Sequence, residues 1–349
     1  MKPEQDGYSV AIVGATGAVG REMLAVLEER KFPVSSLRLF ASPRSAGEDL
    51  LFSGRSYDVE VLTEEVPDGV DLVLFSAGSS VSLDFAPKFA AKGAVVVDNS
   101  SAFRMDSSVP LVVPEVNAQS AFLALGKRGK NIIANPNCST IQLVVALKPL
   151  VDAFGLERVV VSTYQAVSGA GQAGISELSE QVLALFNSGE AATPKTFPHP
   201  IAFNCIPAIG PFRDDGYTEE EWKLVAETRR ILELPRLRVV PTCVRVPVFA
   251  CHSESVLAEF RTKVSEKQVR AALYNGEGIS LMDAPDDDMY PMGFPTAGTD
   301  DVFVGRIRQA PDDDQAIAMW VVADNLRKGA ALNAVQIAEL LVEGPEEDE

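Results

Sequence analysis

One stretch near the start of the chain constrains the fold more than any other. Residues 8–13 form a short apolar run typical of a buried strand, the glycine-rich stretch 14–20 follows at once, and residues 21–31 have a helical pattern. A glycine-rich turn between a strand and a helix lets a pyrophosphate group sit on the helix N-terminus. This order predicts a dinucleotide-binding βα turn; a plain tight turn is the alternative.

The following residues repeat the same order of elements. Further strands of the buried type are predicted at 37–41, 70–75 and 95–98. With a helical pattern at 85–92, this alternation predicts a parallel sheet with helices on both faces. We expect an α/β fold: a Rossmann-type nucleotide domain over residues 1–134, completed by a C-terminal helix within 326–349, and an α+β domain over residues 135–325.

Composition excludes several classes of protein. The net charge of −18 argues against nucleic acid as a partner, because phosphate binding requires a basic surface. No apolar run approaches the ~20 residues that span a bilayer, and residues 1–7 lack an apolar signal core, so we expect a cytoplasmic protein with no membrane partner. Four irregularly spaced cysteines predict neither disulfides nor a metal site. We expect the acidic runs 286–288, 312–314 and 346–349 to be solvated loops and a frayed end.

Cys138 lies where a predicted strand gives way to a predicted helix. The apolar run that ends at Ala134 is typical of a strand, Pro136 forces a sharp exit, and residues 141–150 are apolar over a helical length. A thiol in the first turn of a helix is close to unpaired N–H groups and the positive end of the helix dipole, which favour the thiolate. We therefore interpret Cys138 as a nucleophile; a buried cysteine that only packs is the alternative.

The loop at 42–47 indicates which dinucleotide is bound. It follows the predicted strand 37–41, at the place where an NAD-dependent enzyme is expected to carry an acidic residue, and it contains none. Its Arg44 and neighbouring hydroxyl groups suit a ribose 2′-phosphate. NADP is therefore the predicted cofactor; a surface loop with an incidental arginine is the alternative.

Other charged residues follow or begin predicted elements. Arg104 lies beyond the carboxyl end of a strand, where ligands of α/β sheets collect, and its guanidinium suits a phosphate; a surface salt bridge is the alternative. Glu220 and Lys223 share one face of a helix that Thr218 and Glu221 are expected to cap. They either hold a cation and an anion of one substrate or pair with each other.

Residues 238–252 are predicted to form one long strand, interrupted by prolines, with Arg245 and His252 near its far end. His252 is a better candidate for a general base than His199, which lies between two prolines in a predicted loop. A purely structural histidine is the alternative.

Together these residues resemble the aspartate-semialdehyde dehydrogenase family. The resemblance extends from about Val10 to Glu339 and is carried by the stretches 14–20, 42–47, 98–105, 135–140, 165–171, 217–223, 245–252 and 324–331. It implies NADP-dependent reductive dephosphorylation of a small-molecule substrate, L-4-aspartyl phosphate, to L-aspartate 4-semialdehyde, in the biosynthesis of lysine (through diaminopimelate), threonine and methionine. It also implies that residues 135–325 are the catalytic and dimerisation domain of a homodimer or a dimer of dimers.

The resemblance assigns roles residue by residue. Cys138 would form an acyl-thioester, and His252 would move protons to and from the reacting group. The implied substrate-binding residues are Arg104, Asn137 and Lys223 for the phosphate, Arg245 for the α-carboxylate, Glu220 for the α-ammonium group and Gln165 for orientation. The residues implied to line the NADP site are Gly14, Thr16, Gly17, Ala18, Val19, Arg44, Ser45, Ser168, Gly169 and Asn325, and no metal is implied.

Two other functions remain open at the level of sequence. N-acetyl-γ-glutamyl-phosphate reductase uses the same thioester chemistry on a longer, acetylated substrate. Glu220 favours the aspartyl substrate, because an acetylated nitrogen needs no carboxylate partner. A catalytically silent paralogue that binds a nucleotide or a partner would be expected to lack the nucleophile or the base, and both are present here.

Overall fold

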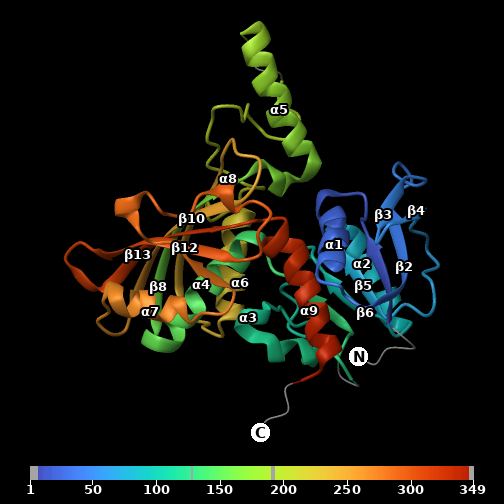
Figure 1. Cartoon of the computed structure of the whole chain (residues 1–349), viewed down its shortest axis with the longest axis horizontal. Helices are drawn as coiled ribbons and strands as arrows, with labels where there is room; N and C mark the ends of the chain where they lie inside the picture. Colours follow the sequence, from blue (N-terminus) through green and yellow to red (C-terminus); the bar gives the residue numbers. More distant parts are fainter. Residues whose placement is uncertain (1–6, 127–128, 190–192, 346–349) are drawn as a thin grey trace. The chain divides into compact units, whose positions relative to one another are not determined.

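The computed structural model describes residues 7–126, 129–189 and 193–345 and divides into two compact units (Figure 1). The first unit comprises residues 1–137 and 330–349, and the second comprises residues 138–329. The division therefore falls immediately before Cys138. Residues 1–6 and the predicted acidic end at 346–349 lie outside the described residues. Among the described helices, none is long and apolar enough to cross a membrane.

The first unit is built on a seven-stranded sheet in the order β3-β4-β2-β1-β5-β6-β7. Its strands are β1 (Tyr8–Val13), β2 (Val34–Ala41), β3 (Asp49–Phe52), β4 (Arg55–Val61), β5 (Leu72–Phe75), β6 (Val95–Asp98) and β7 (Ile132–Ala134). Its helices are α1 (Ala18–Glu29), α2 (Ser79–Ala91), α3 (Pro114–Asn117), the 3-10 helix η1 (Ala118–Ala124) and α9 (Leu332–Glu343). All neighbouring strands are parallel except the edge pair β3 and β4. The predicted Rossmann-type parallel sheet is confirmed.

Burial explains why the central strands of this sheet are continuous apolar runs. Ile12 on β1 and Leu74 on β5 are completely buried, as expected for parallel strands that are covered on both faces. Val335 and Ile337 of α9 belong to the same apolar core, and α9 packs against α1. The short edge hairpin of β3 and β4 was not predicted, because its strands carry several charged residues and lack a clear apolar period.

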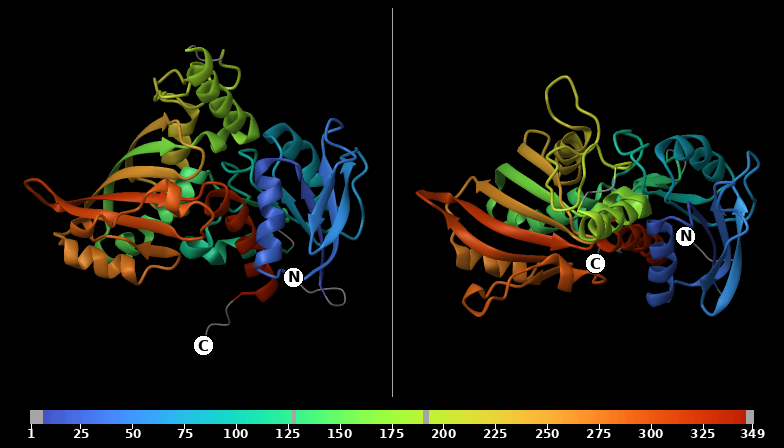
Figure 2. Two further views of the ribbon diagram at one scale, coloured as in Figure 1. Left: turned by 45° about the horizontal axis from the view of Figure 1, so that its top comes forward. Right: turned by 90° about the horizontal axis from the view of Figure 1, so that it is seen from above.

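The second unit contains a six-stranded mixed sheet in the order β11-β12-β13-β10-β8-β9. Its strands are β8 (Leu156–Gln165), β9 (Arg238–Arg245), β10 (His252–Phe260), β11 (Ile279–Leu281), β12 (Val302–Ala310) and β13 (Asp313–Ala323). Its α-helices are α4 (Cys138–Phe154), α5 (Gly171–Ser188), α6 (Glu219–Ile231), α7 (Glu266–Tyr274) and α8 (Gly293–Thr296). The 3-10 helices η2 (Val167–Ala170) and η3 (Pro285–Asp287) also belong to it, and a π-helical turn η4 (Arg327–Ala331) leads out of it. The hairpin of β12 and β13 is visible in both views of Figure 2.

The two faces of this sheet differ. Helix α4 packs against β8, β10, β12 and β13, while α6 packs against β9 and α7 against β11 and β12. The inward side chains of β10 alternate with outward ones, so His252, Glu254 and Val256 all lie on the buried face. The opposite face is partly exposed, with Tyr164 and Trp320 in ring contact on it.

The predicted single strand over 238–252 is wrong. β9 ends at Arg245, β10 begins at His252, and β8 lies between these two strands in the sheet. Pro247 cannot donate to a strand ladder, and Cys251 adopts a left-handed backbone conformation with φ of 66°, so the chain turns between the two strands. Arg245 and His252 therefore reach the site from different strands.

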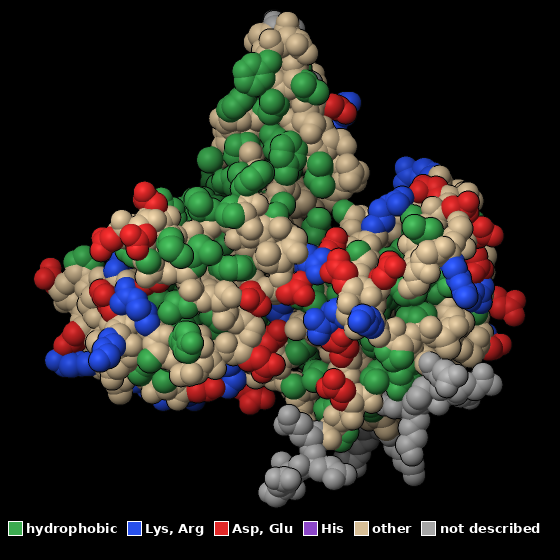
Figure 3. Space-filling view, viewed as in Figure 1, with side chains coloured by type: hydrophobic (Ala, Val, Ile, Leu, Met, Phe, Trp, Pro, Cys, Tyr) green, Lys and Arg blue, Asp and Glu red, His purple; other side chains and the backbone are tan. Residues whose placement is uncertain are grey.

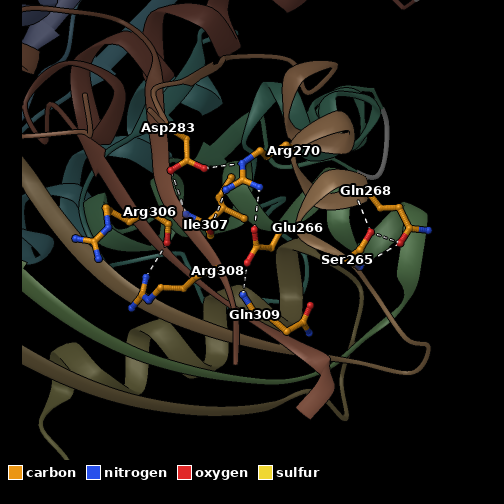
Figure 4. Close-up of polar contacts among 9 residues, drawn as sticks. All are labelled: Ser265, Glu266, Gln268, Arg270, Asp283, Arg306, Ile307, Arg308 and Gln309. Atoms are coloured by element: carbon orange, nitrogen blue, oxygen red, sulfur yellow. Dashed lines mark hydrogen bonds and ion pairs between the residues drawn. The ribbon is translucent and has the colours of Figure 1, made fainter. Parts of the chain in front are cut away.

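Helix α7 was not predicted, although it has a strong start signal. Ser265 and Gln268 form a capping box at its N-terminus. Arg270 donates to Asp283 at 2.7 Å and to the carbonyl oxygen of Ile307 at 2.8 Å, which ties the helix to β12 (Figure 4).

Helix α5 extends away from the rest of the second unit (Figure 1). Hydrophobic side chains gather on it and around its base in the space-filling view (Figure 3). Leu183 and Phe186 are largely exposed, and the rings of Phe186 and Phe203 meet edge to face with centroids 6.1 Å apart. This surface is more apolar than an ordinary solvated helix face.

Candidate active site

Cys138 is the first residue of α4, as the sequence predicted. Its side chain is half-buried rather than fully packed away. A Cβ atom on Gly329 would lie 2.9 Å from the Cβ of Cys138, so the backbone after β13 passes directly beside the cysteine. A thiol in this position is close to the N–H groups of the first helical turn, which stabilise negative charge.

His252 is completely buried at the start of β10. The backbone N–H of Ala166 donates to its Nδ1 at 3.1 Å. Burial first, and then the charge of Arg245, lower the pKa of His252 to about 3. The neutral ring therefore carries its proton on Nε2, and this atom has no hydrogen-bond partner among the described residues. In this tautomer the ring presents an N–H donor at Nε2, and the general-base role of His252 stays a prediction.

Ala166 also contacts the guanidinium group of Arg245. Its carbonyl oxygen accepts a hydrogen bond from Nη1 of Arg245 at 2.7 Å. One peptide segment after β8 thus positions both His252 and Arg245. The guanidinium is buried, which lowers the pKa of Arg245, and the charges of Glu220 and Cys138 oppose this shift.

Glu220 and Lys223 lie on one face of α6, and Thr218 and Glu221 form the predicted capping box. Nζ of Lys223 is 3.0 Å from Oε2 of Glu220, so the intrahelical pair that was one of our two interpretations is present. Nε2 of Gln165 also donates to Oε1 of Glu220, at 3.4 Å. Glu220 is buried while Lys223 is partly exposed. A cation, an anion and an amide therefore form one polar cluster.

The residues after β8 and β13 complete the site in the second unit. Nδ2 of Asn325 donates to Oγ of Ser168 at 2.9 Å. A Cβ atom on Gly169 would lie 2.7 Å from Nη1 of Arg245 and 3.3 Å from Nε2 of His252. Only glycine fits there without displacing one of these side chains. Ser168, Gly169 and Asn325, which the resemblance assigned to the cofactor, therefore lie beside the candidate catalytic groups.

One contact connects the cysteine helix to the histidine strand. Gln142 lies four residues after Cys138, on the same face of α4. Its Nε2 donates to the main-chain oxygen of His252 at 3.3 Å. The structure therefore brings Cys138 and His252 to the same part of the second unit, rather than to opposite sides of it.

The glycine-rich turn of the first unit fits a dinucleotide. Gly14 has a φ of 87°, and a Cβ atom there would lie 2.5 Å from the carbonyl oxygen of Ser76. Gly17 precedes α1 and provides no side-chain cap, so the first N–H groups of α1 remain available to a ligand. Thr16, Ala18 and Val19 stand at the same turn. Arg44 is exposed and Ser45 half-buried in the turn after β2.

Arg104 lies in the first unit and is buried, so the surface salt bridge we considered is wrong. Its Nε donates to the carbonyl oxygen of Asn135 and its Nη2 to that of Asn99, both at 2.9 Å. Asn137 is also buried. Arg104 thus holds the backbone of the segment between β7 and Cys138.

Three residues of the site were missed by sequence reasoning. They are Ala166, which acts through its backbone, and the buried polar residues Gln142 and Glu254. A backbone contact leaves no sequence signal. Glu254, however, occupies an inward position of an otherwise apolar alternation on β10, and such an acid is a recognisable anomaly.

The first unit has a nucleotide-binding sheet, and the second has a helix-start cysteine, a buried histidine and paired charges. Together these features define a class of proteins, the Rossmann-type dehydrogenases. Two family models match in agreement with this: "Semialdehyde dehydrogenase, NAD binding domain" over residues 9–124 and "Semialdehyde dehydrogenase, dimerisation domain" over residues 147–328. The chain belongs to the aspartate-semialdehyde dehydrogenase family.

The relatives are similar over nearly their whole length. The chain is 55% identical to aspartate-semialdehyde dehydrogenase of Aquifex aeolicus, covering 96% of this chain and 98% of the relative. It matches the crystal structure of aspartate semialdehyde dehydrogenase II from Vibrio cholerae, complexed with ASA, with a TM-score of 0.93 and 51% identity over 97% of this chain and 98% of that one. The structure of the Candida albicans enzyme with NADP matches with a TM-score of 0.73 and 28% identity, over 96% of this chain and 98% of that one.

Proposed function

We propose that this protein reduces L-4-aspartyl phosphate to L-aspartate 4-semialdehyde with NADPH, through a thioester on Cys138, in the biosynthesis of lysine, threonine and methionine. One observation supports the proposal: the second unit contains a helix-start cysteine, an imidazole held by the same Ala166 peptide as Arg245, and the paired charges of Glu220 and Lys223. This combination suits a small zwitterion with a reactive acyl group.

The chemistry begins at the sulfur. The thiolate of Cys138 attacks the acyl carbon, the bond from that carbon to the phosphate oxygen breaks, and phosphate leaves with the electron pair. When NADPH is bound, it supplies a hydride to the thioester carbon. The bond between carbon and sulfur then breaks, which restores the thiolate and releases the aldehyde.

His252 acts as a hydrogen-bond donor in this scheme. Its neutral ring carries the proton on Nε2, because Nδ1 accepts from the Ala166 N–H. An N–H donor aimed at the oxyanion of each tetrahedral intermediate contributes about 2.7–4 kcal/mol to transition-state stabilisation. Nε2 can also pass its proton to a departing or newly formed oxygen, which is the proton transfer that the reaction requires.

Each charged side chain is assigned to a substrate group of the opposite charge. Arg245 would bind the α-carboxylate and Glu220 the α-ammonium group, with the Gln165 amide orienting both. Arg104, Asn137 and Lys223 would bind the phosphate. In this assignment substrate competes with Lys223 for Glu220, because these two side chains are paired in the structure.

The first test is Cys138→Ala. We expect phosphate-dependent reduction of NADP with aspartate semialdehyde to fall by at least about a thousandfold, because no other group replaces the nucleophile. NADP binding, measured by titration calorimetry, should be unchanged. Cys205→Ala is the matched control, since Cys205 is an exposed cysteine. Near-normal turnover of Cys138→Ala would reject the thioester mechanism.

The second test concerns the cofactor. Arg44 and Ser45 follow β2 in a turn without an acidic residue, which suits a 2′-phosphate. We expect Arg44→Ala to raise the KM for NADP by about 10- to 100-fold, the loss of one charged hydrogen bond of about 1.5–3 kcal/mol, and to leave the KM for NAD unchanged. Arg55→Ala, at an exposed arginine on β4, is the control. A wild-type preference for NAD would contradict this assignment.

The rival substrate is N-acetyl-γ-glutamyl phosphate. The buried carboxylate of Glu220 would gain no ionic contact from the neutral acetamide of that substrate, whereas the α-ammonium group of the aspartyl substrate would supply one. We therefore expect activity with aspartate semialdehyde and none with N-acetyl-glutamate semialdehyde in the same assay.

We also propose a homodimer that forms through the partly exposed face of the six-stranded sheet. The match to a dimerisation domain over residues 147–328 supports a dimer. The aromatic pair of Tyr164 and Trp320 stands on that face, and aromatic residues are enriched in interfaces. Sedimentation equilibrium of the wild type and of Trp320→Arg measures the oligomeric state. We expect the variant to be monomeric. A variant that remains a dimer would show that the interface does not include this face of the sheet.

A further inference from the structure

Glu254 is a fully buried acid that the chemistry above does not use. It lies on β10 two residues after His252 and on the same face of the strand. Neither of its carboxyl oxygens has a hydrogen-bond partner among the described residues. Burial raises the pKa of Glu254 well above its usual value, and the nearby Gln142 side chain only partly offsets this.

The described residues directly beside Glu254 in the sheet carry no positive charge. Its neighbours across the sheet are Thr163 on β8 and Val321 on β13, and Gln142 approaches from α4. One strand further, Cys243 on β9 pairs with Thr163 and senses the negative charges of Glu220 and Glu221 from α6, together with that of Glu254. The titratable groups on this face of the sheet are therefore these acids, the Cys243 thiol, the neutral His252 on β10, and Arg245, which lies one inward position beyond Cys243 on β9.

The number of hydrogen-bond donors and acceptors around Glu254 indicates whether its carboxyl group is protonated. Nε2 of Gln142 donates to the main-chain oxygen of His252, which fixes the orientation of the amide and leaves Oε1 as its free end. Oε1 of Gln142 is buried and has no partner among the described residues either. An ionised Glu254 would add two more acceptors to this site and no donor. A protonated Glu254 supplies the one donor that Oε1 lacks.

We propose that Glu254 is a positioning residue for His252: as a neutral carboxylic acid it donates to Oε1 of Gln142, whose amide holds the His252 main chain against the helix of Cys138. Because Gln142 lies one turn after Cys138 on α4, this chain of contacts sets the distance between the nucleophile and the imidazole. The inference rests on the proposed function for its kinetic consequence, but the state of the carboxyl group does not depend on it.

Infrared difference spectroscopy tests the protonation state without any assay of activity. The spectrum of the wild type minus that of Glu254→Gln should contain the carbonyl stretching band of a buried carboxylic acid at neutral pH. Other buried acids such as Asp98 cancel in the difference. A difference that contains only carboxylate bands would overturn the proposal, whatever the enzyme proves to catalyse.

Kinetics test the positioning role. Glu254→Leu and Gln142→Leu should each lower kcat by roughly 10- to 100-fold, because a small displacement of a catalytic group is costly, and should leave the KM for NADP unchanged. The double variant should lose no more than either single variant, since both act through one contact. Glu254→Gln keeps a neutral donor in place and should retain kcat within a few fold, with the wild-type pH profile.

Val256→Ala is the matched control. Val256 is buried on the same face of β10, one step further from His252, so its truncation destabilises the sheet without removing the Gln142 contact. If Val256→Ala lowers kcat as much as Glu254→Leu, or if Glu254→Leu keeps full kcat, the positioning role is wrong. Should Glu254→Leu fail to fold, the Gln142→Leu kinetics and the infrared result still decide the matter.

Discussion

Asp98 in the first unit and Glu254 in the second are both completely buried carboxyl groups, yet their surroundings are opposite. Asp98 accepts from Oγ of Ser82 at 2.7 Å and from Oγ of Ser100 at 2.8 Å, and the charge of Arg104 also favours its ionised form. Burial nevertheless raises the pKa of Asp98. Glu254 has no serine hydroxyl or arginine acting on it in this way, and only the Gln142 side chain partly offsets the effect of its burial.

The difference follows from where each acid stands in its sheet. Asp98 is the last residue of the parallel strand β6, where the backbone turns away and the N–H of Ser100 is free to donate to it at 3.1 Å. Glu254 lies within β10, between two antiparallel neighbours that use the backbone groups around it. An acid at a strand end can recruit donors from a loop, whereas an acid inside a sheet depends on the side chains above it.

The largest expected effect is at Asp98. Asp98→Leu should lower the free energy of unfolding by about 3–5 kcal/mol, because it leaves the buried donors of Ser82 and Ser100 without an acceptor. Chemical denaturation monitored by circular dichroism measures this. A loss below about 1 kcal/mol would mean that the hydrogen bonds of Asp98 are not stabilising. Asp98 and Glu254 would then not differ in the way argued above.

Glu254→Leu should have a much smaller effect at pH 7. It removes the desolvation penalty of the carboxyl group and loses one neutral hydrogen bond, the proposed one to Gln142, so the free energy of unfolding should change by less than about 1.5 kcal/mol. The same denaturation experiment reports it. A variant that is destabilised as strongly as Asp98→Leu would show that Glu254 is well partnered, and the contrast would fail.

The third expected effect is a pH dependence. The folded-state pKa of Glu254 lies above its usual value of 4.5, so its contribution to stability is fully present below pH 4.5 and is lost as pH rises toward the folded pKa. The free energy of unfolding of the wild type minus that of Glu254→Gln should therefore fall by about 1.4 kcal/mol per pH unit above pH 4.5.

The subtraction is needed because His252 acts in the other direction. Its folded pKa of about 3 lies below the usual 6.5, so the stability it contributes is present above pH 6.5 and is lost as pH falls toward 3. The contribution of His252 is the same in the wild type and in Glu254→Gln, so it cancels in the difference between their free energies of unfolding. A flat difference between the two proteins across this range would indicate that Glu254 has an ordinary pKa.

The sequence by itself determined the local features that depend on neighbouring residues. The strand, glycine turn and helix at residues 8–31, the helix that begins at Cys138 and the Thr218–Glu221 capping box all appear in the structure as predicted. Each depends on contacts within a few residues, such as an N–H satisfied by a side chain three positions away or an apolar run long enough to be buried.

Only the tertiary structure decided which distant groups meet. β8 separates the strands of Arg245 and His252, and the backbone of Ala166 then holds both side chains. No periodicity encodes a backbone N–H that reaches across a sheet, so neither the tautomer of His252 nor the pairing of Gln142 with the same strand was predictable. Strand order and side-chain protonation arise from burial and from non-local hydrogen bonds, and these exist only once the chain has folded.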